Sequence, residues 1–263
     1  MAWLVQTFVL LRLQPARLLL IALFMQLVLG LTQLPLLGLL VVLSVPGLSA
    51  GLLEAFNMTA QARRPGLRTL FVPLASGAHN GRLLAVGALV FGIGIVSMSL
   101  LLTGSDELMD PALLSRIEQG DLEALASLNQ ETLRQMVLAF LVGLSVSGTI
   151  GYFAIPLIWF GHFKLGAALL TGLRALFVNW AAFLVLSLGL LLVLLPVAVI
   201  SGILFSMAAS GGLMTTIVLG LIMILLLVFQ LLLFGTQYCA FRDIFEMTVD
   251  AGPPPANEDQ LVA

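Results

Sequence analysis

Apolar residues along this chain gather into long runs that carry almost no charge. A helix needs about 17 to 25 mostly apolar residues to cross the hydrocarbon of a bilayer, and each run meets that length. The runs are continuous rather than alternating, which is typical of membrane helices and excludes a membrane β-barrel. We therefore expect an all-α integral membrane protein with six transmembrane helices, at about residues 18–34, 36–56, 83–103, 135–160, 181–205 and 213–240.

The composition supports this assignment and indicates one domain. Hydrophobic residues make up 60% of the 263 residues, charged residues make up 9%, and the mean hydropathy is +1.15. A water-soluble globule of this size cannot bury so much apolar surface, so lipid must be the solvent. We expect a single polytopic membrane domain over residues 1–250, followed by a disordered tail over 251–263 that is rich in proline and acidic residues.

The first two spans need separate interpretation. The first starts late and runs through Pro35 into a second apolar stretch, so it is not expected to be a cleaved signal peptide. The second span is interrupted by Pro46-Gly47. This interruption fits a kinked helix that crosses fully, which we favour, or a re-entrant pair of half-helices.

Basic residues fall almost entirely on one side of this six-span topology. Arg116 and Arg134 lie on one side, and the other nine basic residues lie with the two termini: Arg12, Arg17, Arg63, Arg64, Arg68, Arg82, Lys164, Arg174 and Arg242. Because cytoplasmic loops carry the excess of Lys and Arg, we expect a bacterial inner-membrane protein with both termini in the cytoplasm. The outward loop 104–134 is acidic. Its sequence predicts two short helices, at 110–120 and 121–128. They would form a docking surface for another envelope protein, or a cap over the bundle.

The six spans pair naturally as three hairpins, and an amphipathic stretch precedes each pair. These stretches are Trp3–Arg17, Leu67–Arg82 and Phe163–Trp180. In the third stretch, apolar residues recur at helical spacing, namely Leu165, Leu169, Leu173, Leu176 and Phe177. This pattern predicts a helix that lies in the membrane interface.

The second helix of each pair carries small residues four positions apart. The three stripes are Gly47, Gly51 and Ala55; Gly143, Ser147 and Gly151; and Gly235 with Cys239. Small residues let helix backbones approach closely in lipid, where no hydrophobic force draws helices together. The stripes therefore predict packing inside the bundle, which we favour, or a homodimer face.

The centres of the predicted spans contain no ionisable group, and the polar residues of the spans include four amides. Gln26 and Gln33 are seven residues apart on the first span, and Gln230 and Gln237 are seven apart on the last. Without charge at mid-membrane, ion-coupled transport and proton relays are disfavoured. The amides suit interhelical hydrogen bonds, worth about 1 kcal/mol each, or a polar cavity for a lipid headgroup or small amphiphile.

No catalytic or cofactor motif accompanies the spans. His79, His162 and the single Cys239 lie on different segments, at spacings unlike those of a metal site. A nucleophile elbow, a zinc-protease motif and a phosphate-binding glycine-rich loop are all missing. We therefore expect no enzyme activity, no cofactor and no nucleic-acid partner. Four basic residues could contact anionic lipid: Arg63, Arg64, Arg68 and Arg82. The general excess of basic residues on the cytoplasmic side explains them equally well.

Three segments carry a resemblance to a known family. They are Leu11-Arg-Leu-Gln-Pro, Gly172-Leu-Arg-Ala-Leu-Phe-Val-Asn-Trp-Ala-Ala-Phe and Tyr238-Cys-Ala-Phe-Arg-Asp-Ile-Phe. In them the chain resembles the YciC-like family of six-helix bacterial inner-membrane proteins. It is also similar in pattern to the membrane domain attached to some glycerophosphodiester phosphodiesterases. The resemblance implies a polytopic inner-membrane protein without an assigned activity, and it transfers no catalytic residue.

Two functions fit these observations. We favour a non-enzymatic structural or accessory component of an envelope assembly, in contact with membrane lipids and, through loop 104–134, with another envelope protein. Such a protein could also form a homo-oligomer. The alternative is a carrier or exporter of lipids or small amphiphiles, which predicts a cavity around the glutamines and flexibility at Pro46 and Pro156.

Overall fold

The computed structural model describes residues 2–102, 113, 115–116, 129–208 and 212–246. Helices and short turns account for these residues, and no strand occurs among them. Six helices are long and apolar enough to cross a membrane, with spans at Pro15–Gln33, Leu37–Ala60, His79–Ser97, Leu141–Trp159, Trp180–Phe205 and Thr215–Ile244. The prediction of an all-helical chain with six such helices is therefore confirmed.

The helices extend beyond the predicted spans at several ends. In chain order the elements are α1 (Ala2–Leu13), α2 (Pro15–Gly30), η1 (Leu31–Gln33), α3 (Pro35–Ala60), η2 (Leu67–Phe71), α4 (Val72–Ala75), α5 (Gly77–Leu102), α8 (Gln130–Trp159), α9 (Leu165–Val178), α10 (Trp180–Ala208) and α11 (Gly212–Ile244). Hydropathy marks only the apolar part of a helix, so it missed the polar first turns of α5 and α8.

Helix α3 is the centre of the packing. It runs through Pro46 as one continuous helix of 26 residues, so a pair of half-helices does not form. It contacts α1, α2, α4, α5, α8 and α11. Within its span 61% of the residues are buried, against 11% within the span of α10. The other long helices therefore leave most of their apolar surface uncovered by protein.

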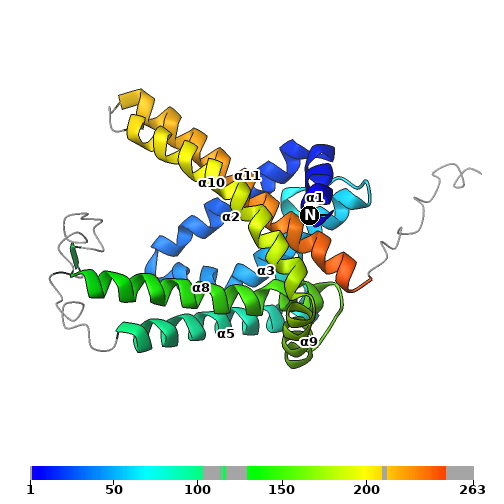
Figure 1. Ribbon diagram of the computed structural model, residues 1–263. Helices are drawn as coiled ribbons and strands as arrows, with labels where there is room; N and C mark the ends of the chain where they lie inside the picture. Colours follow the sequence, from blue (N-terminus) through cyan, green and yellow to red (C-terminus); the bar gives the residue numbers. More distant parts are fainter. Residues whose placement is uncertain (1, 103–112, 114, 117–128, 209–211, 247–263) are drawn as a thin grey trace, which may run out of the picture.

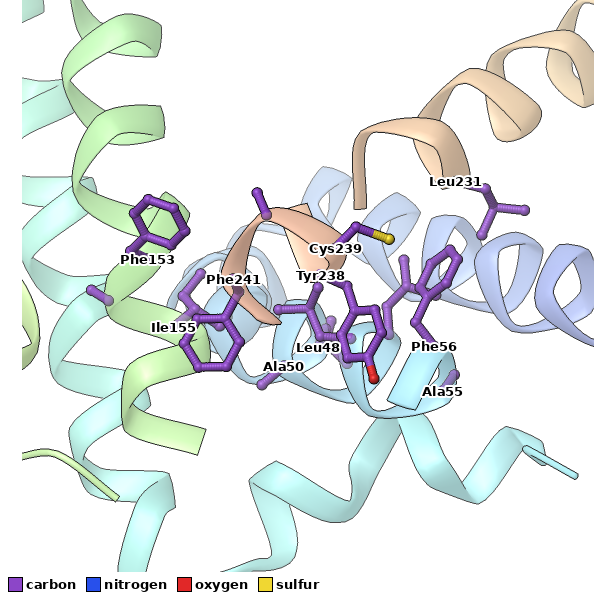
Figure 2. Packing of buried hydrophobic residues seen from close by; sticks show 14 of the residues in the cluster. Leu48, Ala50, Ala55, Phe56, Phe153, Ile155, Leu231, Tyr238, Cys239 and Phe241 are labelled. Carbon is purple, nitrogen blue, oxygen red and sulfur yellow. The ribbon is translucent and has the colours of Figure 1, made fainter. Parts of the chain in front are cut away.

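Three pairs of contacting helices, α2 with α3, α5 with α8 and α10 with α11, diverge from a common end (Figure 1). We call this end the base. There the C-terminal part of α11 packs between α3 and α8, and its aromatic rings fill the centre of the core (Figure 2). Tyr238 stacks on Phe56 at 6.4 Å and Phe241 on Phe160 at 5.7 Å between ring centroids. The best-packed part of the protein is thus one end of the bundle.

Two short helices attach to the base. Helix α1 lies against α11, where the Trp3 indole Nε1 donates to Asp243 Oδ2 at 2.8 Å. Helix α9 packs on α8 through a face of small residues, Ala168, Gly172 and Ala175. Of the apolar residues that the sequence placed on one face of α9, Phe177 is 71% exposed. The small residues of α9 therefore pack on the protein, and Phe177 lies on the outer side of the helix. An exposed apolar residue at this position is typical of a helix that lies in a membrane interface.

The loop that the sequence predicted at 104–134 ends earlier than expected. Helix α8 begins at Gln130, and the Asn129 side chain caps it by accepting from the Thr132 backbone N–H at 2.7 Å. The last residues of the predicted loop 104–134 are therefore helical, which corrects that boundary. Most of 110–120, all of 121–128 and the predicted tail 251–263 lie outside the described residues.

Candidate functional site

The four glutamines of the predicted spans do not meet at one place. Gln26 Nε2 on α2 donates to Gln230 Oε1 on α11 at 2.7 Å, which joins the first and last long helices. Gln237 is 7% exposed, and its Nε2 donates to the Tyr152 carbonyl oxygen on α8 at 2.6 Å. Gln33 lies apart from these contacts, exposed in η1. Three glutamines thus make interhelical hydrogen bonds, and a shared cavity around all four does not form.

An apolar pocket of about 570 Å³ lies between α3, α5, α8, α10 and α11. We call it the intramembrane pocket. Its walls are mostly aliphatic and aromatic side chains from the middle of the spans, with Pro46 of α3, Leu190 of α10 and Phe234 of α11 among them. No charged residue lines it among the described residues. Its volume falls within the range of about 300 to 1,000 Å³ that is typical of small-molecule sites.

The glycine stripes explain why the helices leave this space. On α3, a Cβ at Gly51 would meet the backbone of Leu70, and on α11 one at Gly235 would meet the Thr7 side chain. On α8, by contrast, a Cβ at Gly148 would meet nothing within 4 Å, and Ser147, Gly148 and Gly151 all line the pocket. The small residues of α3 and α11 therefore allow close contacts, whereas those of α8 border a cavity.

The two remaining glycines of the stripes show the same division. A Cβ at Gly47 on α3 would meet the Leu74 side chain of α4, so this position also packs tightly. A Cβ at Gly143 on α8 would only reach ordinary contact, 4.0 Å from the Ser97 Cβ. The spacing of small residues identified the helices involved, but not which stripe faces a neighbour and which faces a cavity.

The polar groups of the intramembrane pocket are few. Thr236 Oγ1 donates to the Leu233 carbonyl oxygen at 2.8 Å, and Gln237 Nε2 donates to the Tyr152 carbonyl oxygen. The Tyr152 hydroxyl is buried and makes no hydrogen bond among the described residues. Because no wall residue is charged, a bare phosphate or carboxylate inside would lose its hydration without compensation. The pocket is therefore chemically suited to an acyl chain or another neutral apolar group.

A second cavity, of about 290 Å³, lies at the base. We call it the base cavity. It is lined by Glu54, Ser76, His79, Trp159, Phe160 and His162. Ser76 Oγ lies 3.0 Å from His79 Nδ1, and His79 Nε2 lies 2.7 Å from His162 Nδ1, so the two histidines form a hydrogen-bonded chain whose direction depends on their tautomers. The His79 ring also makes an edge contact with the Trp159 ring, at 5.6 Å between centroids, and the Trp159 indole Nε1 donates to Glu54 Oε2 at 3.0 Å.

Sequence reasoning missed this cluster because it treated the histidines as unrelated loop residues. A signal was available, since His79 lies near the start of the third span and His162 directly after the end of the fourth. In an antiparallel pair those two ends adjoin. Contacts between α5 and α8 bring the histidines together, and Arg82 of α5 donates to the carbonyl oxygens of His162 and Phe163 at 3.0 and 3.2 Å.

The other basic residues considered from the sequence lie apart from the base cavity. Arg63, Arg64 and Arg68 are exposed in or near the loop after α3. This loop is tied to the start of α2, because Gln14 Nε2 donates to the Arg63 carbonyl oxygen at 2.8 Å. Their exposure is compatible with contacts to anionic lipid.

Within the described part of the chain, no group of three His, Cys, Asp or Glu side chains is arranged to hold a metal ion. Cys239 is buried, at 3.6 Å from the Thr7 hydroxyl. In comparisons with known proteins, no protein-family model, curated protein or solved structure matches this chain.

Proposed function

We propose that this protein is a non-enzymatic membrane protein that binds a lipid or a similar amphiphile, with an apolar chain of the ligand in the intramembrane pocket. The observation that carries the proposal is the pocket itself, which has an uncharged apolar wall and lies between five helices. This proposal develops the carrier alternative of the sequence analysis. The accessory function depends on loop 104–134, most of which lies outside the described residues, so it stays a prediction.

The placement in the membrane belongs to the same proposal. We place the three helix pairs as transmembrane hairpins in a bacterial inner membrane, with the base and both termini on the cytoplasmic side. The side of the basic residues supports this orientation, as does the resemblance to the YciC-like family. The pocket then opens at the level of the hydrocarbon, where acyl chains of the bilayer can enter from the side.

Selectivity in such a site cannot come from hydrophobicity. An acyl chain gains nothing from the hydrophobic effect when it moves from lipid into an apolar pocket, because lipid tails are equally apolar. Binding must instead come from packing against a preformed wall, where each well-placed pair of carbon atoms gains about 0.1 to 0.2 kcal/mol. Filling the pocket with protein atoms should therefore displace the ligand.

The test is a matched pair of glycine substitutions. Gly148→Leu places a side chain in the pocket, whereas Gly220→Leu adds the same side chain on α11, where a Cβ would also meet nothing within 4 Å. Each protein is reconstituted in nanodiscs with a phosphatidylglycerol that carries a photoreactive diazirine in its acyl chain, and crosslinked peptides are mapped by mass spectrometry.

In the wild-type protein and in Gly220→Leu we expect crosslinks concentrated on the pocket walls of α3, α5 and α8. In Gly148→Leu these crosslinks should fall to the level found on other lipid-facing helix surfaces. If both variants crosslink like the wild-type protein, the pocket holds no ligand and the proposal is wrong.

A further inference from the structure

The base cavity contains a carboxylate whose charge has no protein partner in the described structure. Glu54 is half-buried on α3, and its Oε2 accepts from the Trp159 indole at 3.0 Å and from Asn57 Nδ2 at 3.5 Å. Both donors are neutral. The ion pair between Arg134 and Glu131 lies far along α8 from the base and does not involve Glu54. A half-buried carboxylate that has only neutral donors gains from a nearby cation, so Glu54 is a candidate anchor for one.

Two basic side chains lie near the base cavity, and neither is paired with Glu54. Arg82 donates to the backbone carbonyl oxygens of His162 and Phe163 in the turn that follows α8. The Arg242 guanidinium lies over the Tyr238 ring, 5.6 Å from its centroid. Within the described residues neither forms an ion pair with Glu54. The Glu54 carboxylate is therefore available to pair with a cation from outside the chain.

The remaining walls indicate what kind of cation fits. Trp159 and Phe160 line the cavity beside Glu54, and aromatic rings next to a carboxylate are the surroundings that bind organic ammonium groups. A metal ion is disfavoured, because the described residues offer no set of three suitable ligands there. The volume of about 290 Å³ suits a small headgroup rather than a large solute.

We propose that the base cavity binds an ammonium group, with Glu54 as its counter-charge and the rings of Trp159 and Phe160 as its aromatic wall. The ammonium is carried by the headgroup of a phospholipid such as phosphatidylethanolamine, or by a small soluble amine. This site goes beyond the proposed function, because none of the residues that line it lines the intramembrane pocket. Either site can therefore fail without the other.

The histidine pair borders the same cavity. The hydrogen bond between His79 and His162, at 2.7 Å, requires one of the two facing nitrogens to be unprotonated. The charged groups around the pair are Glu54 of α3, Arg82 of α5 and the exposed Lys164 at the start of α9. Glu54 is thus the one acidic side chain among the residues that line the base cavity.

The test compares lipid retention by two glutamine variants. The full-length protein is reconstituted with equal amounts of phosphatidylethanolamine and phosphatidylglycerol. Lipids retained after transfer to detergent are quantified by native mass spectrometry at pH 7.5. Glu54→Gln removes the charge but keeps an oxygen for the Trp159 indole. Glu131→Gln removes an exposed carboxylate at the opposite end of α8 and serves as the control.

We expect the wild-type protein and Glu131→Gln to prefer phosphatidylethanolamine at pH 7.5, and Glu54→Gln to lose about tenfold of this preference, as is typical when a partly desolvated cation loses its carboxylate. N-acetylated phosphatidylethanolamine, which lacks the ammonium, should not be retained selectively.

A second measurement separates the two sources of the ammonium. Free ethanolamine is added to the protein in detergent, and the unfolding temperature is followed. If ethanolamine raises it in the wild-type protein and not in Glu54→Gln, the natural ligand is a soluble amine; if only the phospholipid is retained, it is a headgroup. Equal retention of both phospholipids by the wild-type protein together with no effect of ethanolamine overturns the proposal. The proposal is also wrong if Glu54→Gln retains phosphatidylethanolamine and responds to ethanolamine as the wild-type protein does. It is wrong as well if Zn²⁺ raises the unfolding temperature and ethanolamine does not.

Discussion

His162 occupies a backbone conformation that usually belongs to glycine. Its φ is +57°, and the following residue completes the helix end, because the Phe163 backbone N–H donates to the Leu157 carbonyl oxygen at 3.1 Å. This hydrogen bond joins residues six positions apart, and it closes a turn in which the left-handed residue His162 stands where glycine is common after a helix end. A side chain with a Cβ costs about 1 kcal/mol there. The contact of His162 with His79 offsets part of that cost.

Two substitutions at this position separate the backbone from the side chain. His162→Gly relieves the left-handed strain but removes the histidine contact, whereas His162→Ala removes the contact and keeps the strain. We expect His162→Ala to be less stable than His162→Gly by about 1 kcal/mol. Reversible unfolding in mixed micelles, followed by circular dichroism, measures this difference. Equal stability of the two variants would show that the turn imposes no strain.

The glutamines and histidines show what single residues in the sequence can predict. From the sequence, Gln26 and Gln230 are each expected to make an interhelical hydrogen bond. In the structure they bond to each other, at 2.7 Å between their side-chain atoms. Spacing along one helix cannot identify the helix opposite. The same limit hid the contact of His79 with His162, because these residues are 83 positions apart in the chain.

At the scale of helices, the same small-residue pattern has two structural outcomes. Gly51 lies in a tight contact of α3 with the backbone of Leu70, while Gly148 borders open space on α8. Hydropathy located both helices, since it depends only on local composition. Whether a stripe packs or borders a pocket depends on side chains from other helices, and no local pattern contains that information.

Alanine substitutions should distinguish these outcomes. In Gly51→Ala the added methyl group would overlap the Leu70 backbone, which cannot move like a flexible side chain, so we expect a loss of about 1 to 3 kcal/mol in unfolding free energy. Gly148→Ala should be neutral or slightly stabilising, because alanine favours the helix by about 1 kcal/mol over glycine and meets no atom. Unfolding in mixed micelles gives both values. A stable Gly51→Ala protein would mean that α3 and η2 can separate without loss.

At the scale of the whole molecule, packing is concentrated at the base and the membrane body is open. The buried aromatic rings lie at the base, and the three helix pairs diverge from it (Figure 1). A water-soluble protein could not leave the sides of α10 and α11 so uncovered, but in a bilayer these surfaces face lipid of equal polarity. The diverging pairs also leave room for the intramembrane pocket. The open body and the pocket thus both result from helix pairs that are packed together only at the base.

This arrangement makes a definite prediction about sidedness, because the base carries the positive charge and the opposite end carries Glu131. Cys239, the single cysteine, is buried, so the wild-type chain should give little background with a thiol reagent. In spheroplasts of a bacterium that expresses the protein, a membrane-impermeant maleimide should label Glu131→Cys at once. Arg68→Cys at the base should be labelled only after the membrane is permeabilised. Labelling in the reverse order would place the base outside, and immediate labelling of both positions would show that the long helices do not hold these ends on opposite sides of the membrane.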